Sequence, residues 1–263
     1  MRIAQSVTTR KGIRMLWVGD AHLCPGYDSK RMEAAGKFAA SFRPDVIGFI
    51  GDLGDMPSLN LHRNKIECEG SRYHEDCEVV RDGLADFMRP IYATKKTLPY
   101  RLVTGGNHEN YIRRLVAQDP KMHGHINLER DLRLDAFGFE YHEYQDRVPI
   151  AGFHFTHNIA TKSSISADVN SPKWGFIKKG VSMVVGHTHT KVHLEHPMLT
   201  DDGSKRKIHG INLGCFLHPD MGRQEHWSRN TEYTYDRGIW TFENAERGDA
   251  KITFHRAAED LGV

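Results

Sequence analysis

Polar residues that suit metal binding or acid–base chemistry follow five apolar segments of this sequence. Each segment has the length and composition of a buried strand. Because the carboxyl ends of parallel strands meet at one edge of an α/β sheet, where such sheets hold their ligands, we expect the polar groups to come together. In chain order, the five blocks are Gly19-Asp20-Ala21-His22, Gly51-Asp52-Leu53-Gly54-Asp55, Gly105-Gly106-Asn107-His108-Glu109, His157 and Gly186-His187-Thr188-His189.

The side chains of these blocks offer oxygen and nitrogen donors without thiolates. Such a set suits Mn, Fe or Zn better than a thiolate cage does. One carboxylate can bridge two ions roughly 3.5–4 Å apart, and the pair then clamps the attacking and leaving oxygens of a phosphoryl group. The four cysteines are scattered and form no Cys-x-x-Cys pair, which argues against a zinc ribbon and a disulfide scaffold. Although the chain has 17 histidines, their position after strands is more informative than their number.

Alternating strand-like and helix-like segments in the first half predict a layered βαβ sheet, and the second half is rich in strands. A hairpin is expected around Asp201-Asp202-Gly203, and the polar stretches 57–75 and 159–179 are expected to be loops that cover a site. The predicted helices are Ser29–Phe42, Cys77–Ala93, Asn110–Ala117 and Leu128–Phe137. The predicted strands are Met15–Val18, Val46–Ile50, Tyr100–Val103, Gly152–Thr156, Ser182–Val185, Lys207–Leu213, Gly238–Phe242 and Lys251–His255.

The composition is that of a globular domain. The chain has 263 residues, of which 39% are hydrophobic and 27% charged, and no linker divides it, so we expect a single domain over residues 1–263. No apolar stretch is long enough to cross a bilayer, and Met1–Gly12 lacks the apolar stretch of a signal peptide, so we expect a cytoplasmic protein without a membrane partner. The formal net charge of +2 neither requires nor excludes nucleic acid, and the oligomeric state is not predicted.

The five blocks, in this order across residues 20–189, resemble the calcineurin-like metallophosphoesterase superfamily. The segment Asp52–Leu59 together with Gly106–Glu109 is more loosely similar to bacteriophage-encoded members described as exonucleases or phosphoesterases. The resemblance implies an α/β fold, a four-layer α/β/β/α sandwich in which helices flank two mixed sheets. It also implies two divalent metal ions at one edge, with Mn²⁺ the first choice and Fe, Zn or Ni as alternatives.

The resemblance also assigns roles by motif position. His108 would protonate the leaving oxygen, Asp55 would orient His108, and Glu109 would accept hydrogen bonds without binding metal. His154 is an alternative to His157, which is preferred because it stands at the end of its strand. The first ion would be held by Asp20, His22, Asp52 and His189, and the second by Asp52, Asn107, His157 and His187.

The implied activity is hydrolysis of a phosphodiester, in DNA, RNA or a nucleotide, by attack of a metal-bridging hydroxide. The second block lacks the arginine of the protein Ser/Thr phosphatases, since Met56-Pro57 follows Asp55, and this argues against that class. A phosphomonoesterase of a small metabolite and a non-catalytic scaffold are the alternatives. Arg113, Arg114 and His62 are candidate contacts to substrate phosphates, although each could instead lie on a solvated surface.

Overall fold

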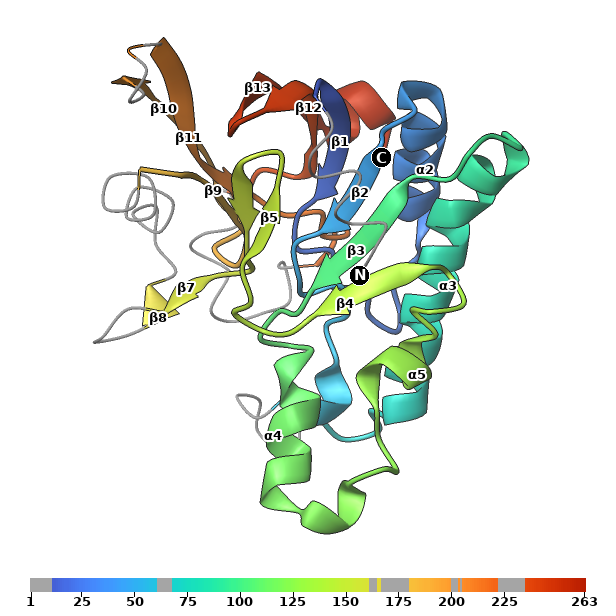
Figure 1. The fold of residues 1–263 in the computed structure, drawn as a ribbon. Coiled ribbons are helices and arrows are strands. Elements are labelled where there is room, and N and C mark those ends of the chain that lie inside the picture. Colours follow the sequence, from blue (N-terminus) through green and yellow to red (C-terminus); the bar gives the residue numbers. More distant parts are fainter. Residues whose placement is uncertain are drawn as a thin grey trace.

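Two β-sheets pack face to face, and helices cover the outer face of the first (Figure 1). The computed structural model describes residues 11–60, 68–160, 165–166, 180–199, 203, 205–221 and 235–263. Within this part of the chain, none of the helices combines the length and the apolar character that a membrane crossing requires.

The first sheet has six strands in the order β13-β12-β1-β2-β3-β4. Strands β1, β2, β3 and β4 run parallel to one another. Strand β12 is antiparallel to β1, and β13 is antiparallel to β12. Alternation along β1 gives the sheet two apolar faces, because Leu16 and Val18 point to the helices whereas Met15 and Trp17 point to the second sheet. The strands are β1 (Ile13–Val18), β2 (Val46–Phe49), β3 (Tyr100–Thr104), β4 (Phe139–His142), β12 (Gly238–Glu246) and β13 (Asp249–Arg256).

Four helices lie on the outer face of the first sheet, and the buried apolar residues of all four belong to one core cluster with that sheet. The two longest helices approach each other closely, since a Cβ added at Gly36 of the first would lie 2.1 Å from the carbonyl oxygen of Phe87 in the second. The helices are α2 (Lys30–Phe42), α3 (Tyr73–Ala93), α4 (Asn110–Gln118) and α5 (Leu128–Leu132), with shorter turns η1 (Pro57–Leu59), η2 (Pro120–Met122) and η4 (Ala257–Leu261).

The second sheet has five strands in the order β10-β11-β9-β6-β5, and a two-stranded ladder, β7-β8, is separate from it. The inner three strands are parallel, and both edge strands are antiparallel to their neighbours. Trp17 fills the space between the sheets by stacking on Phe155 at a centroid distance of 3.8 Å, while Gly48 leaves room for its ring. The strands are β5 (Val148–Ile150), β6 (Phe153–Phe155), β7 (Ile159–Ala160), β8 (Ile165–Ser166), β9 (Ser182–Val185), β10 (Lys191–Leu199) and β11 (Lys205–Leu213).

The structure confirms the α/β class with two mixed sheets, all eight predicted strands and the hairpin pairing of β10 with β11. Helix α3 begins at Tyr73, four residues before the predicted start, so it takes up the end of the stretch predicted to be a loop. Helix α5 ends at Leu132 rather than at Phe137. Strands β4, β5, β7 and β8 were not predicted. Strands β7 and β8 lie in the stretch 159–179 that was predicted to be a loop, and the rest of that stretch up to residue 179 lies outside the described residues. The described elements form three layers, helices, sheet and sheet, and do not include the helical layer expected on the outer face of the second sheet.

Candidate metal centre

The loops that follow β1, β2, β3, β6 and β9 converge at one edge of the two sheets and bring the predicted site residues together. Hydrogen bonds connect these loops directly. Asp20 forms an isolated β-bridge with Cys215, and the peptide N–H of His187 donates to Asp20 Oδ2 at 2.6 Å. The residues that meet are the seven predicted ligands with His108 and Asp55, namely Asp20, His22, Asp52, Asp55, Asn107, His108, His157, His187 and His189.

A first set of donor atoms comes from Asp20, His22 and His189. Nε2 of His22 faces Nε2 of His189 at 3.2 Å, and the latter lies 3.4 Å from Asp20 Oδ2. Nδ1 of His22 is 2.9 Å from a carboxylate oxygen of Asp55, which can only accept, so Nδ1 carries a proton and Nε2 presents a lone pair when this imidazole is neutral. The other carboxylate oxygen, Asp20 Oδ1, is buried without a hydrogen-bond partner. A bound cation would therefore satisfy these atoms better than their contacts with one another do.

A second set comes from Asp52, Asn107, His157 and His187. Nδ1 of His157 donates to the carbonyl oxygen of Ile50 at 3.0 Å, so Nε2 presents a lone pair when this imidazole is neutral. Around that Nε2 lie Asn107 Oδ1 at 3.0 Å, Asp52 Oδ2 at 3.3 Å and His187 Nδ1 at 3.3 Å. Four electron-rich atoms thus converge in a buried space, and a divalent cation would satisfy all of them.

The carboxylate of Asp52 lies between the two sets. Its Oδ2 is 3.3 Å from His157 Nε2 and 3.7 Å from His22 Nε2, and its Oδ1 accepts a hydrogen bond from the peptide N–H of His108 at 2.9 Å. Burial opposes its charge, but the charges of His157 and His108 and the hydrogen bond from His157 hold the pKa of Asp52 well below its usual value. A single ionised oxygen is therefore positioned to be shared by two cations.

The electrostatics of the histidines reflect this concentration of acids. Burial alone would lower the pKa of His22, yet the hydrogen bond to Asp55 and the charge of Asp52 raise it to about 9. The pKa of His157 is likewise raised to about 9, because the charges of Asp52 and Asp20 outweigh the effect of burial. For His187, burial and the neighbouring His157 lower the pKa to about 4. The carboxylates thus favour positive charge in this space, which bound metal ions would supply.

His108 contacts Asp55 mainly through the backbone. Its Nδ1 lies 2.6 Å from the carbonyl oxygen of Asp55 and 3.6 Å from the carboxylate oxygen Oδ1. That same carboxylate oxygen is closer to His22, at 2.9 Å. Asp55 therefore holds both imidazoles, His108 by its carbonyl group and His22 by its side chain, whereas the sequence predicted only the contact to His108. Because a carbonyl oxygen can only accept a hydrogen bond, Nδ1 of His108 carries a proton. Nε2 is therefore the ring nitrogen that is left for chemistry.

Glu109 connects the loops that carry Asp52 and Asn107. Its buried carboxylate accepts hydrogen bonds from the peptide N–H groups of Asp52, Leu53 and Gly106 at 2.8 Å, and from Gly54 at 3.3 Å. Burial and the nearby charge of Asp52 raise the pKa of Glu109, and the peptide donors oppose that effect. The prediction that Glu109 accepts hydrogen bonds rather than joining a donor set agrees with this geometry.

Arg31 supports the first loop, and sequence reasoning did not identify it. The side chain is buried in α2, and its guanidinium donates to the carbonyl oxygens of Phe216 at 2.8 Å, Ala21 at 3.0 Å and Asp28 at 2.8 Å. Ala21 stands between the candidate ligands Asp20 and His22, so this arginine fixes the backbone that presents both. Nothing in the spacing of α2 distinguishes it from a surface arginine.

Four of the candidate ligands have left-handed backbone conformations, which are rare for residues other than glycine. The φ angles are 43° for His22, 46° for Asp52, 76° for His187 and 59° for His189. Such conformations gather at functional sites, where the surrounding structure compensates their cost of about 1–3 kcal/mol each. Close approach also requires glycine here, since a Cβ at Gly106 would lie 2.1 Å from Asp52 Oδ1.

The predicted substrate contacts are placed less directly. Arg113 and Arg114 are exposed on α4, and Arg113 forms an ion pair with Glu143 at 2.5 Å. His62 lies outside the described residues. Of the two alternative ligands on and after β6, His157 joins a donor set, whereas His154 lies mid-strand opposite Met183 and is in neither set.

A scan against protein-family models and a search of curated protein sequences returned no match to this chain. The geometry of the site and its sequence motifs are therefore the features that indicate a function.

Proposed function

We propose that this protein is a phosphoesterase that uses two divalent metal ions to hydrolyse a phosphodiester, in a nucleic acid or a nucleotide. The observation that carries the proposal is the pair of buried donor sets that share the carboxylate of Asp52, with His108 beside them. The mixed oxygen and nitrogen donors fit Mn²⁺, and they also fit Fe or Zn.

The residues divide into those that hold ions and those that handle protons. Asp20, His22 and His189 would hold one ion, Asn107, His157 and His187 the other, and Asp52 both. When bound, two such ions polarise the phosphoryl oxygens and lower the pKa of a water molecule. The chain's own contribution is to keep the ligands in place: Glu109 and Asp55 fix the backbone and the imidazoles through the hydrogen bonds described above.

His108 is the candidate general acid. With Nδ1 held by the carbonyl oxygen of Asp55, a protonated His108 can donate only from Nε2, so the direction of proton transfer is fixed by the backbone. Its side chain is 13% exposed, which leaves access for a leaving group at the surface of the site. Proton donation to the leaving oxygen is the step that a poor leaving group, such as a sugar alkoxide, requires.

The preference for a diester is supported by the helix that follows His108. Helix α4 starts two residues later and carries Arg114 exposed, within two turns of the candidate acid. A nucleic acid or nucleotide has further phosphates beside the reacting one, and an exposed guanidinium on a helix that begins at the site suits such a group. A small monoester would not need this contact.

The test combines metal analysis with hydrolysis of bis- and mono-p-nitrophenyl phosphate in the presence of Mn²⁺. We expect about two Mn²⁺ per chain and faster turnover of the diester. Asp52→Asn is expected to lose metal and activity, because the shared oxygen loses its charge. His125→Asn is the control and should match the wild type, since His125 is exposed and belongs to neither donor set.

Two results would contradict the proposal. Unchanged metal content in Asp52→Asn would exclude the shared ligand, and turnover of the monoester alone would replace the diester with a small phosphomonoester as substrate. Single- and double-stranded DNA form the next arm, where a steep fall of cleavage with salt is expected if backbone phosphates are bound.

A further inference from the structure

A second group of metal-ligating side chains lies on the β10–β11 hairpin, apart from the centre described above. His193 and Glu195 are two residues apart on β10, so they share a face of the sheet, and Glu195 pairs directly with His209 of β11. This face is the inner one, because Ile211, two residues beyond His209, belongs to the core between the sheets.

The three donor atoms have the spacing of a tetrahedral metal site. Nε2 of His193 is 3.1 Å from Nδ1 of His209, and Oε1 of Glu195 lies 3.7 Å and 3.9 Å from these two atoms. Ligand atoms about 2.0–2.1 Å from a tetrahedral Zn²⁺ are roughly 3.3–3.4 Å from one another. Small side-chain rotations would therefore bring all three into coordination.

Neighbouring groups orient two of these donors toward the shared space. The ring of His209, 1% exposed, stacks on Phe153, and its Nε2 donates to Asp249 Oδ1 at 2.9 Å, which leaves Nδ1 with the lone pair. Glu195 directs its other oxygen, Oε2, to the ammonium group of Lys207 at 2.7 Å, so Oε1 remains for the imidazoles. A carboxylate on the far nitrogen of a histidine is a recurring feature of zinc sites.

We propose that His193 Nε2, His209 Nδ1 and Glu195 Oε1 bind a Zn²⁺ ion that is distinct from the two ions of the metal centre. Two imidazoles and one carboxylate suit Zn²⁺, and solvent would take the fourth position, since the side chains of His193 and Glu195 are 26% and 43% exposed.

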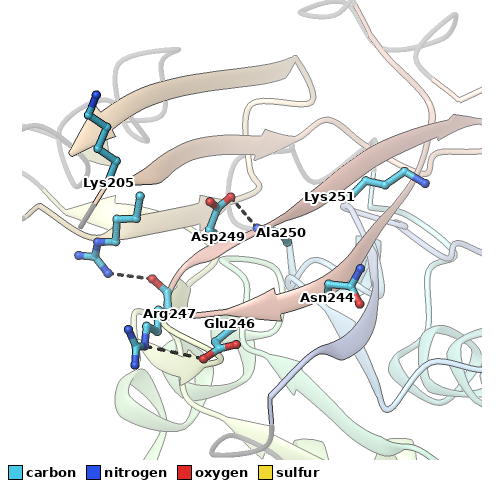
Figure 2. Close-up of a pocket in the computed structure, with 8 residues that line it drawn as sticks. Lys205, Asn244, Glu246, Arg247, Asp249, Ala250 and Lys251 are labelled. Atoms are coloured by element: carbon cyan, nitrogen blue, oxygen red, sulfur yellow. Dashed lines mark hydrogen bonds and ion pairs between the residues drawn. The ribbon is translucent and has the colours of Figure 1, made fainter. Parts of the chain in front are cut away.

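The ion would connect the two sheets. Its ligands belong to the second sheet, and Asp249, which holds His209, belongs to β13 of the first. Figure 2 shows Asp249 beside the β12–β13 turn, in a surface pocket of about 470 Å³ that it shares with Lys205 at the start of β11. The hairpin and the edge of the first sheet meet at this pocket, so the ion would strengthen an open end of the sandwich.

A chain of hydrogen bonds without metal is the competing arrangement. If Nε2 of His193 carries a proton, it can donate to Nδ1 of His209, and His209 in turn donates from its Nε2 to Asp249. In that case Glu195 serves only as the partner of Lys207, and substitutions here do not change the metal content.

The test counts zinc per chain after equilibrium dialysis against buffered Zn²⁺, by elemental mass spectrometry. We expect His193→Gln and Glu195→Ala each to bind about one equivalent less than the wild type. His196→Gln is the matched control, because His196 is exposed on the same strand but points to the opposite face, and it should bind as the wild type does.

The comparison is independent of the centre that Asp52 would share. If that centre holds no metal, the wild-type count falls, but the difference of one equivalent between wild type and variant remains. Circular dichroism checks that the variants fold, and since Glu195 is exposed, at least one of them should do so. Wild-type zinc content in a folded His193→Gln or Glu195→Ala chain would overturn the proposal in favour of the hydrogen-bonded chain.

Discussion

His108 differs from the other histidines of the metal centre in what holds it. Its Nδ1 faces a backbone carbonyl oxygen, and it belongs to neither of the donor sets that Asp52 joins. We therefore expect His108→Ala to keep the wild-type Mn²⁺ content while kcat for a diester falls about a hundredfold or more, because the leaving oxygen loses its proton donor.

The readouts are elemental analysis and kcat, measured with a dinucleotide, whose leaving group is a sugar alkoxide, and with bis-p-nitrophenyl phosphate. p-Nitrophenol is more acidic than a sugar hydroxyl and its anion needs less protonation on leaving, so the deficit of His108→Ala should be smaller with bis-p-nitrophenyl phosphate than with the dinucleotide. Full activity of His108→Ala, or a loss of metal equal to that of Asp52→Asn, would remove His108 from the proposed role.

At the scale of residues, the sequence was sufficient where a side chain stands directly after a strand. The position of Asp20, Asp52 and His187 at the ends of apolar segments predicted that they meet, and they do. It was insufficient where a backbone atom makes the contact. The carbonyl group of Asp55 that holds His108 has no sequence signal, because every residue offers the same group.

Helices α2 and α3 each contain a glycine against which another part of the chain packs, and the surroundings of these two glycines differ. A Cβ at Gly36 would meet the carbonyl oxygen of Phe87, a fixed backbone atom, whereas one at Gly83 would meet the end of the Leu23 side chain, which can move. Both substitutions by alanine gain up to about 1 kcal/mol of helix propensity. We expect Gly36→Ala to destabilise the fold by roughly 1–3 kcal/mol in balance, because the helices must separate, and Gly83→Ala to change stability by less than about 1 kcal/mol.

Urea unfolding of the two variants beside the wild type measures both changes in the free energy of unfolding. Equal stability of Gly36→Ala and Gly83→Ala would show that the backbone contact between the helices relaxes without cost.

Prediction at the scale of elements succeeded for apolar strands and failed for polar or short ones. Strand β4 has one buried residue, Phe139, and three half-buried ones. Strand β5 contains Pro149, and within a sheet proline is normally confined to edge strands. The first turn of α3, from Tyr73 to Asp76, is mostly polar, so only the packing of the whole helix shows that it continues to Tyr73. Tertiary contacts decide such segments, and one sequence does not contain them in readable form.

The candidate metal centre draws its candidate ligands from both sheets, so metal binding is expected to stabilise the whole molecule. Asp20 and Asp52 follow strands of the first sheet, while His157 and His187 follow strands of the second. An ion that binds only the folded chain adds about 2.7 kcal/mol at a concentration one hundred times its Kd. We expect chelation of the metal to lower the Tm of the wild type and Mn²⁺ to restore it.

Differential scanning calorimetry with and without Mn²⁺ measures this effect. Asp52→Asn is the control, since it keeps the ligands of the proposed zinc site but loses the oxygen that both ions would share. An equal rise of Tm in the wild type and in Asp52→Asn would place the stabilising Mn²⁺ elsewhere in the molecule.

The contact between His22 and His189 has a consequence for how the protein folds. These imidazoles are 3.2 Å apart although 167 positions separate them along the chain. Closing so long a loop costs conformational entropy, and contacts between residues close in sequence do not compensate that cost. Non-local contacts of this kind therefore slow folding. The first donor set therefore cannot exist until β9 has joined the second sheet, so a growing chain would be unable to bind the proposed first metal ion until late in synthesis.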